Sequence, residues 1–361
     1  MLHNPYKDIQ RVQKCRKVYF QEQQPEEIWA EVLENDHEEM QELCRAMRQL
    51  VYEVGVPKFL VHLSAKLLYH FVYRWWGHYT KESDFLASAC SSVSPSLMAF
   101  LQRQYTLAHM GCSVVMTWDE QEKRMLCFRS LDWKGADDIA RATRMFSFVD
   151  SAGKEVAKIA GITAMVGVLT GVKEGFSIAI NYAPWKRSAS FKSDPTFLIR
   201  QLLEDDKINS YEDAMQKIRS WDVGSPCFIS LCGIEKGEAC VIELSHQSKV
   251  HIREMGEEKV LIQTNHYDLQ SSPFTKHNEP AYDEEMNEEQ WYVSELLKNS
   301  QKREALMKAE FTKNSDLSMK EKLIQLYKQV PILNWETAQW VIMHPDRGDL
   351  KVYASLDKKQ I

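Results

Sequence analysis

The chain has 361 residues, of which 44% are hydrophobic and 27% are charged, a composition that supplies a large core and excludes disordered and collagen-like proteins. Its 51 acidic and 45 basic residues give a net charge of −6 with no basic cluster, which argues against nucleic acid as a partner. Eight cysteines without any Cys-x-x-Cys pair argue against a disulfide scaffold or a zinc site, and we expect no metal and no cofactor.

The first 110 residues have the pattern of helices. Apolar residues recur at three- and four-residue spacing over 25–54 and over 58–76, which predicts two amphipathic helices. The second stretch ends with Phe71, Trp75 and Trp76 and has two interpretations, a core helix or an interfacial helix that contacts a membrane surface. No segment is apolar enough to predict a transmembrane span, and no secretory signal or glycosylation acceptor is visible, which favours a cytoplasmic protein.

Beyond residue 110 the sequence alternates between strand and helix patterns. Strands are predicted over 112–118, 124–133, 176–182, 227–234, 239–245, 249–254, 259–264, 339–344 and 350–354, and helices over 194–204, 211–221, 283–311 and 319–330. This order favours an α+β fold in which antiparallel sheets pack between helical layers, rather than a parallel βαβ array.

Most common motifs are missing. The glycines at 161, 167, 171 and 175 do not form a phosphate loop, because no Ser or Thr follows Lys173. The chain has no His-Glu-x-x-His and no Gly-x-Ser-x-Gly sequence. Ser151 and Lys154 match Ser-x-x-Lys, a pattern that chance produces in a chain of this length.

One group of residues has the composition of a thiol active site. Cys112 stands where the helical region ends and a strand begins, and Arg129 and Asp132 follow on the next strand of the same hairpin. That arrangement can bring a cation and a carboxylate close to a thiol. Since Arg129 and Asp132 are three residues apart, they would face opposite sides of an ideal strand and need a bulge or a strand end between them.

The segment 111–133 resembles the start of the catalytic subunit of acid ceramidase and N-acylethanolamine acid amidase. These enzymes are cysteine N-terminal nucleophile hydrolases, a group that includes choloylglycine hydrolase. They share Cys-Thr-Ser-Ile-Val followed by Arg-Asn-Met/Leu-Asp, which correspond to Cys112-Ser-Val-Val and Arg129-Ser-Leu-Asp132 here. Further matches follow in the family's order at 167–171, 176–181, 210–214, 237–242, 263–268 and 331–334.

The resemblance implies an αββα sandwich made as a precursor. Residues 1–111 would form a helical α-chain or propeptide, and residues 112–361 the catalytic domain. The thiol of Cys112 would attack the carbonyl of Gly111, cleave the chain, and expose an α-amine that serves as the base. The mature enzyme would hydrolyse linear amide bonds of fatty N-acyl amides, such as ceramide or an N-acylethanolamine, through a thioester, and the two chains would stay associated.

The resemblance also implies roles for single residues. Asp132 would orient the new amine, and Arg129 would stabilise the thiolate or contact the substrate carbonyl. Asn265 would donate its amide to the oxyanion, and a backbone N–H near Asn181 would add a second hydrogen bond. Structural alternatives stay open: an ordinary buried cysteine, an Arg129–Asp132 ion pair, and two asparagines in turns.

The chain departs from the family at several positions. Tyr182 replaces a glutamate, and the family's Asp-Asp-Arg-Arg run after Tyr-Asp is missing. His266 follows Asn265 and gives Thr-Asn-His, which resembles the penicillin acyltransferase branch, as does Gly111 before Cys112. An N-acyltransferase, a bile-salt or penicillin amide hydrolase, and an inactive lipid-binding homologue are therefore the alternatives. The resembling enzymes are lysosomal, which would replace the cytoplasmic address if their targeting carried over.

Overall fold

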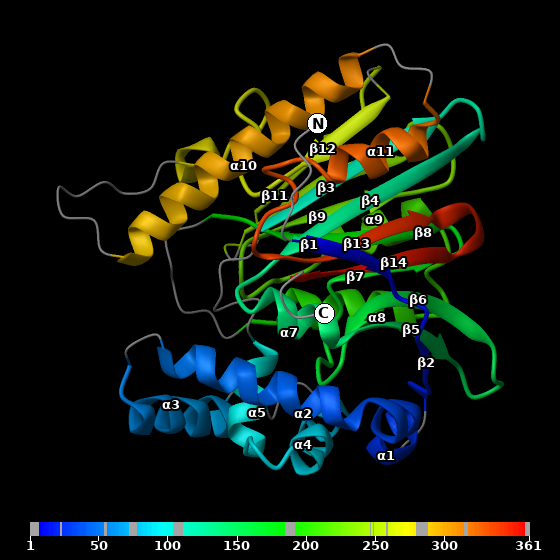
Figure 1. Ribbon diagram of the computed structural model, residues 1–361. Coiled ribbons are helices and arrows are strands. Elements are labelled where there is room, and N and C mark those ends of the chain that lie inside the picture. The colour runs from blue at the N-terminus through cyan, green and yellow to red at the C-terminus, as the bar shows by residue number, and fades with distance from the viewer. Residues whose placement is uncertain are drawn as a thin grey trace.

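The computed structural model describes residues 7–21, 24–53, 56–71, 78–103, 111–184, 192–245, 247, 249–257, 259–278, 288–313 and 317–357. Strands from both ends of the chain and from its middle form two sheets, which face each other across a shared apolar core (Figure 1). Within these residues, no helix has both the length and the apolar character needed to cross a membrane.

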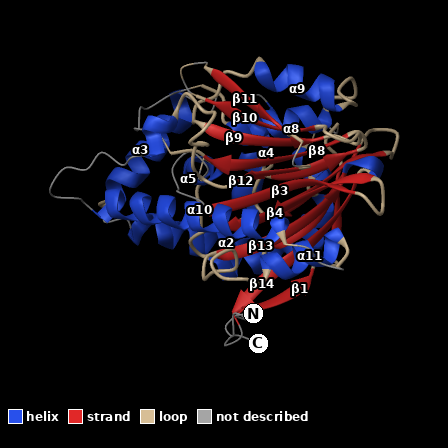
Figure 2. Cartoon of the chain, turned by 90° about the horizontal axis from the view of Figure 1, so that it is seen from above, coloured by secondary structure: helices blue, strands red, loops and turns tan. Residues whose placement is uncertain are grey.

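The first sheet has six strands, all paired antiparallel, and contains the candidate nucleophile. Figure 2 shows it from above with its strands in the order β12, β3, β4, β13, β14 and β1. These strands are β12 Val260–Gln263, β3 Gly111–Asp119, β4 Arg124–Asp132, β13 Thr337–His344, β14 Asp349–Asp357 and β1 Lys7–Arg11.

The second sheet has eight strands in the order β11-β10-β9-β8-β7-β6-β5-β2, and only the β2–β5 pair is parallel. Its members are β11 Val250–Glu254, β10 Ala239–Leu244, β9 Cys227–Cys232, β8 Phe176–Tyr182, β7 Thr170–Lys173, β6 Glu155–Ile162, β5 Thr143–Val149 and β2 Cys15–Val18. Apolar side chains from both sheets, such as Val114 and Met116 against Val172 and Ala179, fill the space between them.

Helices cover the outer faces of both sheets. On the six-stranded sheet, Met307 of α10 (Glu288–Thr312) and Leu323 of α11 (Met319–Tyr327) pack against Val115 and Phe128. On the eight-stranded sheet, α8 (Pro195–Glu204) lies over β6 and β7, and α9 (Tyr211–Arg219) lies over β9. The predicted α+β sandwich is therefore confirmed.

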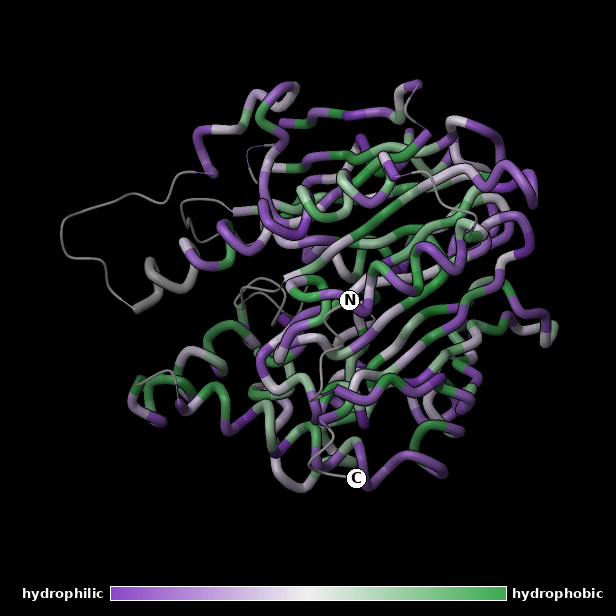
Figure 3. The backbone as a smooth tube through the Cα atoms, turned by 45° about the horizontal axis from the view of Figure 1, so that its top comes forward, coloured by the Kyte–Doolittle hydropathy of each residue, from purple (hydrophilic) through white to green (hydrophobic). Residues whose placement is uncertain are grey.

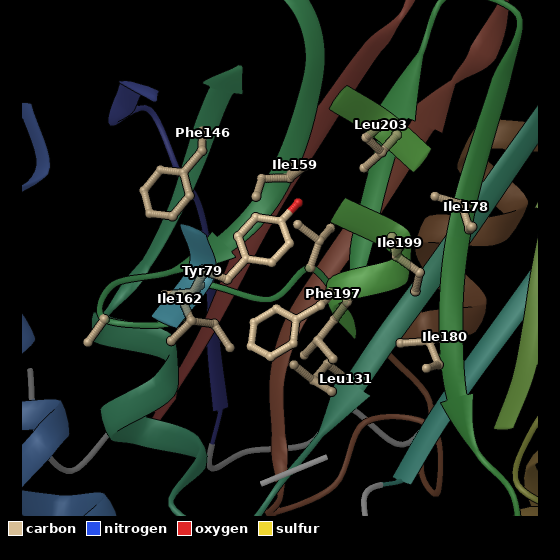
Figure 4. Packing of buried hydrophobic residues seen from close by; sticks show 14 of the residues in the cluster. Tyr79, Leu131, Phe146, Ile159, Ile162, Ile178, Ile180, Phe197, Ile199 and Leu203 are labelled. Carbon is tan, nitrogen blue, oxygen red and sulfur yellow. The ribbon is translucent and has the colours of Figure 1, made fainter. Parts of the chain in front are cut away.

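The N-terminal helices extend the core at the β5 and β6 end of the second sheet. Their bounds are α1 Pro25–Ile28, α2 Ala30–Glu53, α3 Lys58–Phe71, α4 His78–Ala89 and α5 Pro95–Gln102, and the short α7, Ala136–Arg141, follows β4. Figure 4 shows Tyr79 of α4 next to Phe197 of α8, and their rings stack 5.3 Å apart. The N-terminal part thus shares one core with the rest of the chain.

Most of the predicted elements after residue 110 are confirmed within a few residues, and the first 110 residues need a correction. The predicted all-helical start is wrong, because β1 pairs with β14 and β2 pairs with β5. Strands β5, β6 and β7 were not predicted from the sequence. Of the predicted helix 58–76, the structure describes residues 58–71, so Trp75 and Trp76 lie outside the described part.

Candidate active site

Cys112 is the second residue of β3 and is completely buried. The β3–β4 ladder pairs Cys112 with Leu131 and Gly111 with Asp132. The amide nitrogen of Cys112 donates a hydrogen bond to Asn265 Oδ1 over 2.7 Å. Two contacts therefore hold the peptide bond between Gly111 and Cys112, the predicted cleavage site. They are the pairing of β3 with β4 and the hydrogen bond to the side-chain amide of Asn265.

Arg129 places its guanidinium beside the thiol. Its Nη2 lies 3.4 Å from Cys112 Sγ and donates to the carbonyl oxygen of Ile180 over 3.0 Å. Its Nη1 donates to Thr170 Oγ1 over 2.6 Å. Thr170 and Ile180 belong to the second sheet, so this buried cation bridges the sandwich and is fixed by partners on the strands opposite.

The environment of Cys112 favours the neutral thiol over the thiolate. Burial raises its pKa above the usual range, and the charge of Asp132 raises it further, while Arg129 and Arg303 act in the opposite direction. The thiolate is the nucleophilic form of cysteine. Reaction at Cys112 therefore requires a base that removes this proton.

Asp132 is the last residue of β4, and its carboxylate is buried. It accepts hydrogen bonds from Thr337 Oγ1 over 2.8 Å and from Asn334 Nδ2 over 2.9 Å. The β4–β13 register shifts at this point, where Asp132 pairs with Thr337. Asp132 thus has the strand-end position that its spacing from Arg129 requires. Burial raises the pKa of this carboxyl, and nearby Arg303 partly offsets the effect.

Asn265 comes two residues after β12 and is completely buried. Its Oδ1 accepts from the Cys112 amide and, over 2.9 Å, from Arg303 Nη2, while its Nδ2 donates to the carbonyl oxygen of Tyr182 over 3.0 Å. Because both donors face Oδ1, they fix the orientation of the amide. The NH₂ group that would donate to an oxyanion therefore faces away from the Cys112 amide.

Asn181 lies at the end of β8, and its side chain holds the segment that carries Asn265. Its Nδ2 donates to the carbonyl oxygens of Gln263, over 3.1 Å, and Thr264, over 2.9 Å. Asn181 is thus linked to Cys112 through the segment that carries Asn265. Its role in oxyanion binding stays a prediction, as do the roles predicted for the other four residues.

Arg303 also lies at Cys112, although the sequence did not predict it as a site residue. This side chain is buried on α10 and donates from Nη1 to the carbonyl oxygen of Cys112 and to Ser113 Oγ, the latter over 2.7 Å. Its Nη2 contacts Asn265, as described above, and its Nε donates to Asn299 Oδ1 over 2.7 Å. Arg303 therefore connects Cys112 to Asn265, the predicted oxyanion donor.

A sequence signal for Arg303 existed in the helical phase of α10. The buried residues Leu296, Ser300, Arg303 and Met307 recur at spacings of four, three and four, which is one face of a helix. An arginine on the apolar face of a charged helix is a candidate for a buried functional cation. Among the described residues, no three His, Cys, Asp or Glu side chains are grouped as metal ligands would be.

Residues 122–332, more than half of the chain, match the acyl-coenzyme A:6-aminopenicillanic acid acyl-transferase family. The chain belongs to this family. It is 27% identical over 194 residues to acid ceramidase of Balaenoptera acutorostrata scammoni, a match that covers 45% of this chain and 47% of that protein. It is 22% identical over 283 residues to acid ceramidase of Bos taurus, a match that covers 69% of each. The chain thus spans about half the length of the first of these relatives.

Among solved structures, the fold is similar to the Caenorhabditis elegans ortholog of N-acylethanolamine-hydrolyzing acid amidase. The TM-score is 0.51 at 19% identity, and the match covers 66% of this chain and 94% of that one. The predicted resemblance to this group of N-terminal nucleophile hydrolases is confirmed. The predicted enzyme class, an amide hydrolase, is the class that the names of these relatives give.

Proposed function

We propose that this family member cleaves itself between Gly111 and Cys112 and then hydrolyses the amide bond of N-acyl amide lipids through a thioester on Cys112. The observation that carries the proposal is the convergence on Cys112 of a guanidinium, a buried carboxylate and an oriented side-chain amide, from Arg129, Asp132 and Asn265. These are the residue types that acyl transfer to a thiol requires.

In the activation step, Sγ of Cys112 attacks the carbonyl carbon of Gly111 and the C–N bond breaks. The acyl group moves to sulfur, and the thiol proton ends on the nitrogen, which becomes a free α-amine. Water then hydrolyses the thioester and leaves a carboxylate on Gly111 and a thiol on Cys112. A Cβ on residue 111 would lie 3.0 Å from Cβ and Oδ2 of Asp132, so glycine lets the scissile bond approach this carboxylate.

In the hydrolytic step, the α-amine of Cys112 accepts the thiol proton. Its unperturbed pKa of about 8 makes it a usable base near neutrality. The thiolate attacks the substrate carbonyl, the oxyanion accepts the Asn265 amide hydrogen, and the ammonium returns a proton to the leaving amine. Water resolves the acyl-enzyme to a fatty acid. Asn265 Oδ1, which accepts from Cys112 N in the intact chain, is placed to accept from the amine as well.

The substrate class follows from the relatives, which are named for ceramide and for N-acylethanolamine. An alternative acceptor for the acyl group is an amine rather than water, which the name of the family itself suggests. Both reactions share the thioester at Cys112. The two reactions can be distinguished by incubating the purified enzyme with an N-acyl amide, with and without a free amine acceptor. Transfer to water releases a fatty acid, whereas transfer to the amine forms a new amide.

The decisive test is intact-mass analysis with N-terminal sequencing of the purified protein. We expect one new N-terminus at Cys112, and activity on a fluorogenic N-palmitoyl amide that appears with it. Cys112→Ala should abolish both cleavage and turnover, while Cys127→Ala, which removes another buried thiol from the neighbouring strand β4, should keep both. Full activity in protein that retains Met1 as its only N-terminus would contradict the proposal.

We also propose that the two cleavage products remain together. Residues before the cleavage site contribute β1 and β2, one to each sheet. Glu82 of α4 forms a buried ion pair with Arg200 of α8, with Nη1 to Oε2 at 2.8 Å. Separation of the fragments would expose this charge pair and two strand edges. Under native conditions the fragments should therefore migrate as a single species in gel filtration.

Contact with a lipid surface is proposed for α3. Phe59 and Phe71 are 69% and 71% exposed, and Leu63 and Leu67 are each 50% exposed, so this helix presents an uncovered apolar face. Green, hydrophobic segments follow this helix at the edge of the molecule in Figure 3. Leu63→Glu should reduce cosedimentation with phosphatidylcholine–phosphatidylserine vesicles several-fold, whereas Leu269→Glu, at an exposed leucine elsewhere, should not. Equal binding by both variants would exclude α3.

A further inference from the structure

His266 stands between Asn265 and Tyr267, where the acid ceramidase pattern has no residue, and its side chain has partners on α10. Its Nδ1 lies 2.8 Å from Ser300 Oγ and 3.1 Å from Thr264 Oγ1, and its Nε2 lies 3.1 Å from Glu304 Oε2. Ser300 is completely buried, and His266 is 5% exposed. The imidazole is therefore anchored between two hydroxyls and a carboxylate, with both of its nitrogens occupied.

The hydrogen-bond chain ends on the backbone of the predicted oxyanion donor. The amide nitrogen of Asn265 donates to Ser300 Oγ over 2.7 Å, and Ser300 Oγ also lies 2.8 Å from Thr264 Oγ1. Ser300 is one turn before Glu304 on α10, so one helix face carries both ends of the chain. Asn265 is thus held at its backbone by Ser300, while Arg303 of the same helix holds its side-chain oxygen.

The carboxylate determines the proton positions. Ionised Glu304 can only accept, so Nε2 of His266 carries the proton that it shares with Glu304. In the neutral ring, Nδ1 is then an acceptor. Ser300 Oγ donates to Thr264 Oγ1, which leaves the hydroxyl hydrogen of Thr264 for Nδ1. This leaves the lone pairs of Ser300 Oγ directed at the Asn265 N–H. Burial alone would raise the pKa of Glu304, but the hydrogen bond from His266 and the charge of Lys308, whose Nζ lies 3.1 Å from Oε1, hold it below its usual range.

We propose that Glu304, His266 and Ser300 form a positioning relay that fixes Asn265 for oxyanion binding. The inference rests on the proposed function, because it assigns these residues no contact with substrate and lets them act only through Asn265. Donors to an oxyanion work when they are held in place before charge develops. A histidine after the asparagine is then an added support for Asn265 rather than its replacement.

The proposal predicts how single substitutions divide between kcat and KM. Ser300→Ala removes the acceptor of the Asn265 N–H and should lower kcat about tenfold while KM stays within about twofold. His266→Leu should have a similar effect. His266→Asn places an amide oxygen near the position of Nδ1, where it can still accept from the Thr264 hydroxyl, and should recover most of kcat. Ser294→Ala removes another buried hydroxyl from the same helix and should leave kcat unchanged.

A double-mutant cycle distinguishes this relay from a purely structural network. In the Asn265→Ala background, Ser300→Ala should cause no further loss of kcat, because the group that it positions is gone. The loss of thermal stability caused by Ser300→Ala should be the same in both backgrounds. Multiplicative losses of kcat in the cycle, or unchanged kcat in Ser300→Ala alone, would overturn the relay.

The same experiment separates the relay from the proposed function. If Asn265→Ala itself keeps wild-type kcat, the oxyanion assignment fails, and the relay fails with it. If Asn265→Ala loses about a hundredfold or more in kcat while Ser300→Ala and His266→Leu lose nothing, only the relay is wrong. If Asn265→Ala loses activity and the relay variants follow it without adding to it, both hold.

Discussion

Replacing Arg303 should damage the active site more than any other substitution on α10. Arg303→Met keeps much of the side-chain volume but removes the donors to the Cys112 carbonyl, Ser113 Oγ and Asn265 Oδ1. A hydrogen bond from a charged group contributes about 1.5–3 kcal/mol. If one such bond to Asn265 is needed in the transition state, kcat should fall by about ten- to a hundredfold, since about 1.4 kcal/mol corresponds to a factor of ten.

The fold should also lose stability. Arg303 is completely buried, and burial lowers its pKa, whereas the charge of Asp132 raises it. Removing one member of a buried charged group typically costs about 3–5 kcal/mol, because the remaining charge is left without compensation. Arg303→Lys keeps the charge near Asp132 but cannot form the forked contacts, so it should recover stability better than it recovers kcat.

The assay combines steady-state kinetics on a fluorogenic N-acyl amide with urea unfolding of the same preparations. Lys302→Met is the matched control, because Lys302 is the neighbouring cation on α10 and is exposed. That variant should match the wild type in both measurements. A folded Arg303→Met protein with kcat within about threefold of wild type would refute the reasoning, since it would mean that the Asn265 amide needs no support from Arg303.

Three further predictions address pH, cleavage and the association of the two parts of the chain. Burial raises the pKa of Glu243 from 4.5 to about 7, so between these pH values the folded state keeps a proton that the unfolded state has lost. The free energy of unfolding should therefore fall by about 3 kcal/mol as pH rises from 4.5 to 7. Glu243→Gln should remove that fall. Gly111→Val should slow self-cleavage at least about tenfold, measured by mass spectrometry, because the new side chain displaces Asp132. Arg200→Met should lower the free energy of unfolding by about 3–5 kcal/mol in urea, because it leaves Glu82 buried without its partner.

Each of these predictions has an internal comparison. For the pH prediction, the measured quantity is the difference in the free energy of unfolding between Glu243→Gln and the wild type, which removes the contribution of other titrating groups. A difference that is constant from pH 4.5 to 7 would contradict the raised pKa of Glu243. For cleavage, Gly256→Ala is the control, since a Cβ there meets no atom within 4 Å. For stability, Arg219→Met removes an exposed arginine from α9, and a loss equal to that of Arg200→Met would exclude a special role for the buried pair.

The sequence predicted strands well where their alternation was complete. Strand β8 was predicted with its observed bounds, and β3 and β4 within one residue at each end. Strand β5 was missed because Arg144 interrupts its apolar pattern. In the fold, that arginine is buried and paired with Asp36 and Glu39 of α2, over 2.7 and 2.8 Å. A charge that is neutralised by a distant helix cannot be distinguished from a solvent-exposed charge in one sequence.

The residues of the candidate site also differ in whether the sequence could predict them. Cys112, Arg129 and Asp132 could be predicted together because one hairpin carries all three, so their proximity is local. Asn265 required the family resemblance, since it follows β12, a strand that pairs with β3 but is about 150 residues away in the sequence. Arg303 has neither a local link to Cys112 nor a motif of its own. Its neighbours in the sequence, Lys302 and Glu304, are charged, so the sequence around it does not mark a buried position.

In the intact chain, Asn265 already contacts the nitrogen that the proposed cleavage would release. Asn265 Oδ1 faces the nitrogen of Cys112, and two donors fix that orientation before any bond is broken. Cleavage at Gly111 would change this nitrogen from an amide to an amine without requiring the asparagine to move. Since the contacts of Oδ1 and Nδ2 fix the orientation of the Asn265 amide before any bond is broken, the proposed self-cleavage and turnover would depend on the same contacts. We therefore expect substitutions at Asn265 and Arg303 to slow self-cleavage and turnover together, whereas substitutions on the exposed apolar side of α3 should affect neither when the substrate is soluble.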